Sequence, residues 1–175
     1  MPDDRAFVLM IERAVADGQS WDLLLTTILT ALDADSGTIH IIGEDGVLHL
    51  AAASAGIPQV VLDTVRHVPV GKGMAGLAVQ RKQAVNACNI QTDTSGDVRP
   101  GARVTGLQGS VVVPILRGDV ALGALGVATR RERTFTRDEE ELLLEVGRAL
   151  AIAVASSASA RPTSSSRADD ERSSS

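Results

Sequence analysis

Two pairs of apolar segments, each joined by a tight polar turn, constrain the fold of this chain more than any other feature. Residues 36–42 and 47–54 flank the turn sequence GEDG. Residues 110–116 and 120–130 flank a second tight turn, RGD. Strands connected by such short turns pair as antiparallel hairpins. The sequence therefore predicts an α+β protein with a central antiparallel sheet.

Apolar residues at helical spacing predict helices before, between and after these hairpins. The expected helices cover residues 3–17, 21–34, 57–68, 74–82 and 134–157. Ser20 and Thr136 are predicted N-caps, since acidic residues follow each of them in the first turn. We expect three regions, which are an N-terminal helix in 1–19, a folded domain in 20–156 and a disordered Ser-rich tail in 157–175.

The composition argues against several partners. The aromatic residues are two Phe and one Trp, with no Tyr, so a flavin, a haem or a nucleic acid base would find few rings to stack on. The net charge is −5 and no basic stripe stands out, so we expect no nucleic acid partner. The apolar runs are shorter than the roughly 20 residues that cross a membrane. With no signal-peptide pattern either, we expect a cytoplasmic protein without a membrane partner.

The stretch GKGMAG, residues 71–76, has the G-x-G-x-x-G spacing of a dinucleotide-binding loop. That loop requires a buried strand before it, but the preceding segment contains Pro69 and is a poor central strand. We therefore interpret Gly71 and Gly73 as a tight turn and Gly76 as a site of close helix packing. The amides at this helix start remain a place for an anionic part of a ligand.

These segments resemble a known family in their order along the chain. VPVGKGMAGLAVQRKQAVNACNI looks like the core of a GAF domain, and the sequences before and after it, in residues 23–56 and 106–154, are similar to the beginning and end of that family. The resemblance covers roughly residues 20–156. It implies a GAF/PAS-like sheet with the terminal helices on one face, where they pair with a second subunit. It also implies a small-molecule pocket on the other face and a sensory or regulatory role in signal transduction.

The chain departs from the specialised members of that family. It lacks the Asn-Lys-x-Phe-Asp-Glu type signature of the cyclic-nucleotide binders, and Cys88 is not followed by the His of the bilin binders. The free methionine sulfoxide reductases use two or three cysteines, whereas this chain has one. We therefore expect a domain that is not an enzyme and binds an unknown small ligand. The alternatives are a ligand-free dimerisation or adaptor module and a Cys88-dependent reductase.

The resemblance and the residue types suggest a lining for this pocket. The predicted ligand-binding residues are Met74, Leu77, Val85, Cys88, Arg99, Val104, Leu107 and Ser110. Arg99 would clamp an anion, or be a solvated loop charge. Cys88 would be a small lining residue, or a redox-sensitive thiol. The expected partners are a second copy of the chain, through the first and last helices, and an unidentified output protein.

The first hairpin offers one further candidate site. If its turn is centred on Glu44-Asp45, His40 faces His49 across the strands, at about 5 Å between Cβ atoms. Such a pair could bind a metal, ligate haem or sense pH. It could also be a polar pair on a partly wet face, since no third metal ligand is placed. In this register Leu48 shares the opposite face with Ile39.

Overall fold

The computed structural model describes residues 3–159, so the predicted tail lies outside the described residues from position 160 onward. The helices are α1 (Asp4–Ala16), α2 (Trp21–Ala31), α3 (Gln59–Val65), α4 (Gly73–Arg81), the 3₁₀ helix η1 (Pro100–Thr105) and α5 (Arg137–Ser159). The strands are β1 (Ser36–Ile42), β2 (Val47–Ala53), β3 (His67–Pro69), β4 (Val85–Ala87), β5 (Gly109–Arg117) and β6 (Val120–Thr129). No helix of this part of the chain is both long and apolar enough to cross a membrane.

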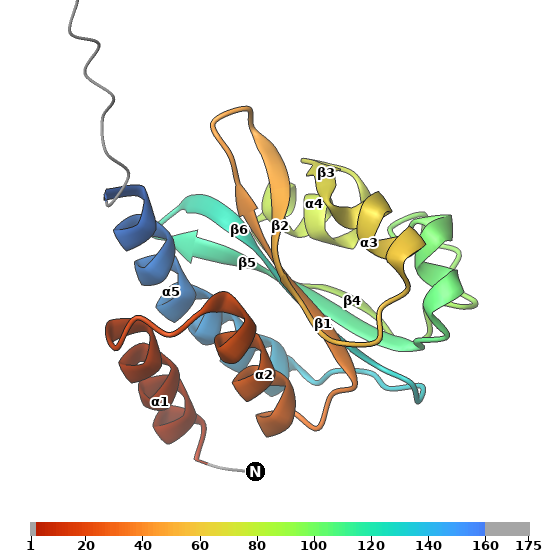
Figure 1. The fold of residues 1–175 in the computed structure, drawn as a ribbon. Coiled ribbons are helices and arrows are strands. Elements are labelled where there is room, and N and C mark those ends of the chain that lie inside the picture. Colours follow the sequence, from red (N-terminus) through yellow and green to blue (C-terminus); the bar gives the residue numbers. More distant parts are fainter. Residues whose placement is uncertain (1–2, 160–175) are drawn as a thin grey trace, which may run out of the picture.

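The strands form one antiparallel sheet in the order β3-β2-β1-β6-β5-β4. The two hairpins, β1–β2 and β5–β6, lie next to each other through the pairing of β1 with β6 (Figure 1). The short strands β3 and β4 form the two edges. The predicted α+β fold with a central antiparallel sheet is therefore confirmed.

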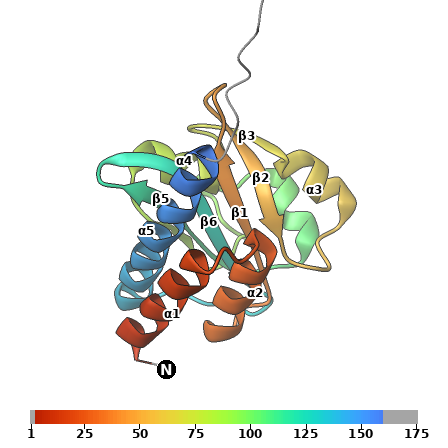
Figure 2. The same cartoon turned by 60° about the vertical axis from the view of Figure 1, so that its left-hand side comes forward.

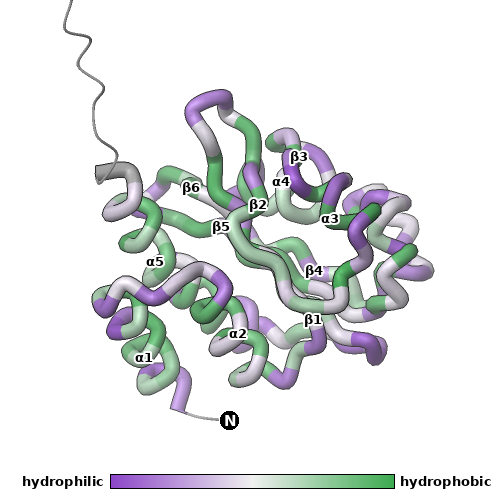
Figure 3. The backbone as a smooth tube through the Cα atoms, in the orientation of Figure 1, coloured by the Kyte–Doolittle hydropathy of each residue, from purple (hydrophilic) through white to green (hydrophobic). Residues whose placement is uncertain are grey.

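Helices cover both faces of this sheet. Helices α1, α2 and α5 lie together on one face, and α3, α4 and the segment around η1 lie on the other, as two views show (Figures 1 and 2). The larger hydrophobic core lies between the sheet and the terminal helices, with Ile39, Val113 and Leu143 fully buried in it. Strands β5 and β6 consist mainly of hydrophobic residues, whereas the tip of the β1–β2 hairpin is polar (Figure 3). Burial of apolar side chains thus stabilises the packing of α1, α2 and α5 against the sheet.

The two predicted N-caps begin their helices as expected. The Ser20 hydroxyl accepts a hydrogen bond from Leu23 N–H at 3.3 Å. The Thr136 hydroxyl accepts one from Glu139 N–H at 3.2 Å, and the Glu139 carboxylate accepts one from Thr136 N–H at 2.8 Å. This reciprocal pair is a capping box, which satisfies two amides at the start of α5.

The register of the first hairpin differs from the predicted one. Gly43 N–H donates to Val47 C=O at 2.9 Å, so the loop holds three residues and its last, Gly46, has a φ of +73°. A bulge also lies between Ile39 and His40. A shift of one residue moves side chains to the other face of a sheet. Leu48 accordingly packs on the α4 side, and the prediction that it shares a face with Ile39 is wrong.

The predicted pair of His40 and His49 is wrong for the same reason. His40 pairs with Leu50, and His49 pairs with Ile41 on one side and with His67 of β3 on the other. The His49 and His67 rings meet edge to face, with 4.9 Å between centroids. The two histidines that the sequence placed together therefore lie in separate environments.

Candidate ligand-binding cavity

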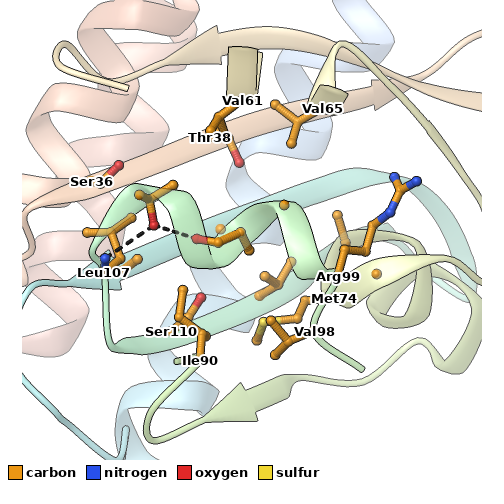
Figure 4. Close-up of a pocket in the computed structure, with 18 of the residues that line it drawn as sticks. Ser36, Thr38, Val61, Val65, Met74, Ile90, Val98, Arg99, Leu107 and Ser110 are labelled. Carbon is orange, nitrogen blue, oxygen red and sulfur yellow. Dashed lines mark hydrogen bonds between the residues drawn. The ribbon is translucent and has the colours of Figure 1, made fainter. Parts of the chain in front are cut away.

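A cavity of about 180 Å³ lies between the sheet and the layer of α3, α4 and η1. Its floor consists of alternate residues of three neighbouring strands, because every second side chain of a strand points to the same face. These floor residues are Ser36, Thr38 and His40 of β1, Ser110 and Val112 of β5, and Gly126 and Ala128 of β6. Figure 4 shows the labelled lining residues converging from the strands and from the opposite layer.

The opposite wall comes from three segments that are separate in the sequence. Val61 and Val65 lie one turn apart on α3 and therefore share a face of that helix. Met74 comes from the first turn of α4, and Val98 and Leu107 come from the long connection between β4 and β5. The lining is thus mainly aliphatic, and the hydroxyl groups lie mostly on the floor.

The size of the cavity limits what it can hold. A dry engineered cavity of about 150 Å³ accepts benzene, so about 180 Å³ has room for a ligand of roughly six to nine non-hydrogen atoms. Drug-sized ligands occupy pockets of about 300–1,000 Å³. A purine nucleotide, a haem or a bilin exceeds this volume, so only part of such a ligand would fit inside the cavity in this conformation.

The predicted lining residues divide into two groups. Met74, Arg99, Leu107 and Ser110 line the cavity. The other four do not. Leu77 and Val85 pack into the second hydrophobic cluster beside α4. Val104 is 64% exposed on η1, and Cys88 is exposed after the end of β4. The prediction that Leu77, Val85, Cys88 and Val104 line the pocket is wrong, because the sequence did not show which way α4, β4 and η1 face.

Several lining residues were missed from the sequence, and some of them leave a signal there. Ser36, Thr38 and His40 are polar residues at every second position of an otherwise apolar strand, which indicates a face that differs from the core. Val61 and Val65 are spaced one helical turn apart. No comparable pattern marks Val98, because it lies in an irregular loop.

His40 is a buried, neutral group on the floor of the cavity. Its side chain is 3% exposed, and Nε2 lies 2.8 Å from the carbonyl oxygen of Val65. A carbonyl only accepts, so Nε2 carries the proton and donates. Among the described residues, Nδ1 has no hydrogen-bond partner, although it is buried. Burial lowers the pKa of His40 below 6.5, although the hydrogen bond to Val65 opposes this. In the described part of the chain, no three His, Cys, Asp or Glu residues are placed to hold a metal ion.

We expect His40→Phe to lower the free energy of unfolding by about 1–2 kcal/mol at neutral pH, because the Val65 carbonyl loses its buried donor. The substitution should also change the pH dependence. A lowered pKa in the folded state means that the unfolded state binds the proton first, so the wild type loses stability as the pH falls below 6.5. Urea unfolding at about pH 7.5 and about pH 5.5 should show this loss in the wild type and a smaller one in His40→Phe. His67→Phe, at an exposed position, is the control; an equal slope in the wild type and His40→Phe would contradict the assignment.

The loop between β4 and β5 is attached to α4 beside the cavity. Arg81 of α4 makes two hydrogen bonds with the carboxylate of Asp97, at 3.0 and 3.3 Å. Within the loop, Arg103 donates to the carbonyl of Asp93 at 2.9 Å. Paired contacts between a guanidinium and a carboxylate fix orientation as well as distance. They therefore hold the wall formed by Val98 and its neighbours against α4.

Comparisons with known proteins agree on one fold. A family model described as GAF domain matches residues 21–155. The GAF domain of Acinetobacter phosphoenolpyruvate-protein phosphotransferase is 19% identical with a TM-score of 0.74, and the match covers 90% of this chain and 95% of that one. Free methionine-R-sulfoxide reductase from Neisseria meningitidis, in complex with its substrate, is 19% identical with a TM-score of 0.72, over 90% of this chain and 92% of that one.

A domain assigned to a two-component sensor histidine kinase from Sinorhizobium meliloti is 18% identical, with a TM-score of 0.60 over 75% of this chain and 85% of that one. At such identities the likeness concerns the fold alone. Comparison with curated proteins finds no match.

Proposed function

The chain belongs to the GAF domain family, and we propose that it is a regulatory domain that binds a small molecule in the cavity between the sheet and α3, α4 and η1. The observation that carries this proposal is the cavity itself. Side chains leave about 180 Å³ unfilled between the sheet and the helical layer, and most of the residues around this space are aliphatic. Concave, mostly apolar sites with a few polar groups are typical of small-molecule binding.

The sheet offers a route from the ligand to the terminal helices. On β5, Ser110 and Val112 line the cavity, whereas Val111 and Val113 pack into the core beneath α1, α2 and α5. Helix α5 lies close to the same strand, since a Cβ at Gly147 would be 2.8 Å from the Pro114 carbonyl oxygen. A ligand that favours one position of β5 would therefore favour one packing of α5. The output would pass to a second copy of the chain or to another protein.

An alternative role as a ligand-free dimerisation or adaptor module is favoured by apolar residues exposed on the terminal helices. Leu9 and Met10 of α1 and Ile152 of α5 are each about half exposed. Such residues can form an interface with or without a ligand. The two roles differ in whether the cavity is occupied when the protein acts.

A reductase role has less support from the site. Cys88 is the single cysteine of the chain, is exposed, and lies outside the cavity. A thiol that reduces a bound sulfoxide must reach it, and its oxidised form needs a second thiol to regenerate it. We therefore propose a domain that binds its ligand without converting it.

We expect Ser110→Leu to abolish ligand binding while the protein stays folded, because the added carbons fill part of the cavity that Ser110 lines. Ser110→Ala is the matched control, since it removes the hydroxyl without filling space. The wild type and both variants would be purified from native expression, and small molecules released from each would be identified by mass spectrometry. Molecules that accompany the wild type and Ser110→Ala, but not Ser110→Leu, are the expected result. An empty wild-type cavity, or equal occupancy in Ser110→Leu, would contradict the proposal.

A further inference from the structure

We propose that the cavity ligand is a short aliphatic carboxylic acid, whose carboxylate lies beside Lys72, Arg99 and the N-terminus of α4 and whose far end hydrogen-bonds to Ser110. This inference rests on the proposed function, since it names the ligand class of the same cavity. Four features support it: the sign of the charges at the lining, the uncapped helix, the unpaired serine and the aliphatic wall between them.

The charges that line the cavity are all of one sign. Of the residues that the structure describes, Lys72 and Arg99 line it, and no Asp or Glu does. The chain as a whole carries a net charge of −5, so this local excess of positive charge runs against the composition. In the described structure neither Lys72 nor Arg99 has a carboxylate partner. Two unpaired cations at a cavity favour an anionic group on the ligand.

The backbone amides at the start of α4 also favour an anionic group on the ligand. Helix α4 begins after Lys72, where no side chain caps it, and its first three residues, Gly73, Met74 and Ala75, all line the cavity. Amides in the first turn of a helix have no partner within the helix and carry partial positive charge. Gly73 also lets Arg99 approach, because a Cβ there would lie 2.8 Å from the Arg99 Cδ. The guanidinium stem and the helix start therefore meet at the same rim, where Lys72 and Arg99 are exposed.

A polar group also lies at the end of the cavity away from Arg99. Ser110 is 8% exposed and lines the cavity, and its hydroxyl has no hydrogen-bond partner in the described structure. Figure 4 shows this hydroxyl among the lining side chains, away from Arg99. The hydroxyl is therefore available to hydrogen-bond a polar atom of a ligand in the cavity. Met74 and Val98 lie toward the Arg99 end, which favours an aliphatic chain between the two polar groups.

The same features disfavour a free amino acid. An amino acid carries an ammonium group next to its carboxylate. The lining, as far as the chain is described, offers that ammonium two cations and no carboxylate. Like charges at such a site reduce affinity. The proposed ligand is therefore an acid without an amino group, which separates this cavity from one built for methionine sulfoxide.

Matched six-carbon probes test this inference by calorimetry at low salt. We expect hexanoate to bind about tenfold more tightly than hexan-1-ol, and hexylammonium and norleucine to bind more weakly than hexanoate. The double variant Lys72→Gln/Arg99→Gln should lower hexanoate affinity about tenfold and leave hexan-1-ol unchanged. Lys82→Gln/Arg130→Gln removes the same charge outside the cavity and is the control. Ser110→Ala should weaken ω-hydroxyhexanoate binding severalfold without changing hexanoate binding.

The outcomes separate this inference from the proposed function. Equal binding of hexanoate and hexan-1-ol, or no effect of Lys72→Gln/Arg99→Gln, would overturn the acid assignment while leaving a cavity that binds small molecules. Failure of every probe to bind would also overturn it. The proposed function is judged independently, by the molecules that accompany the wild type but not Ser110→Leu.

Discussion

Gly76→Ala should destabilise the protein by about 3 kcal/mol, because a Cβ at this position meets backbone atoms that cannot move independently. The added carbon would lie 2.4 Å from the carbonyl oxygen of Pro69 and 3.0 Å from the amide nitrogen of Gly71. Gly76 C=O also accepts a hydrogen bond from Gly71 N–H at 2.9 Å. Strand β3, the glycine turn and α4 are therefore packed against each other at one glycine.

The sign of this effect is informative, since helix propensity alone predicts the opposite. Alanine in a helix interior is favoured over glycine by about 1 kcal/mol. Urea unfolding should show a lower midpoint for Gly76→Ala than for the wild type. Gly101→Ala is the control, because the nearest atom to its added Cβ is 3.9 Å away, and it should change stability by less than about 0.5 kcal/mol. An unchanged or higher midpoint for Gly76→Ala would contradict the close-packing role.

The same geometry shows that the GKGMAG stretch is not a dinucleotide-binding loop. The segment before it is a three-residue edge strand of an antiparallel sheet, and a dinucleotide loop requires a buried parallel strand there. Gly71 and Gly73 have φ values of +85° and +62°, which favour glycine, and Gly71 N–H is already bonded within the turn. The amides left for a ligand are those of Gly73, Met74 and Ala75, at the start of α4. The GKGMAG stretch thus packs β3 against α4, and it leaves the N-terminus of α4 beside the cavity.

The parts of the fold that local chemistry determines could be predicted from the sequence. Tight turns between apolar segments predicted both hairpins, and Ser20 and Thr136 predicted the starts of α2 and α5. These features depend on neighbours within a few residues, so the sequence carries them directly. The layers followed from the resemblance to GAF domains, since nothing local indicates which face of the sheet a helix covers.

The register of the strands, and the side on which a short helix such as η1 is buried, could not be predicted in the same way. One residue more in the first hairpin loop moved His40 away from His49 and Leu48 to the other face. Such irregularities are selected by packing across the whole sheet. Val104 was chosen because it is apolar, yet it lies on the exposed side of η1, and its loop neighbour Val98 is buried. The cavity therefore depends on tertiary packing. The sequence indicates it only where polar and apolar residues alternate along a strand, as at Thr38.

Glu139→Ala should destabilise the protein by about 2–3 kcal/mol, because it removes the capping box of α5 and the partner of the largely buried Arg133 guanidinium. The Glu139 carboxylate accepts hydrogen bonds from Thr136 N–H and from Arg133. Arg133 also donates to the carbonyl of Leu32 at 3.1 Å and lies 4.4 Å from the centre of the Phe135 ring. One carboxylate thus orients an arginine that links the end of α2 to the start of α5.

The pH dependence separates the charge of Glu139 from its packing. Burial by itself raises the pKa of Glu139, but the hydrogen bond from Thr136 and the hydrogen bond and charge of Arg133 outweigh it, so the pKa is lowered below 4.5. A lowered pKa stabilises the folded protein above pH 4.5 and stops doing so as the pH falls through the lowered value. Glu139→Gln can keep the capping geometry and loses the charge. Its stability difference from the wild type should therefore be present at neutral pH and shrink below pH 4.5, whereas Glu139→Ala keeps a residual deficit from the lost cap. A Glu139→Gln difference that stays constant across this range would show that the charge of Glu139 does not stabilise the fold.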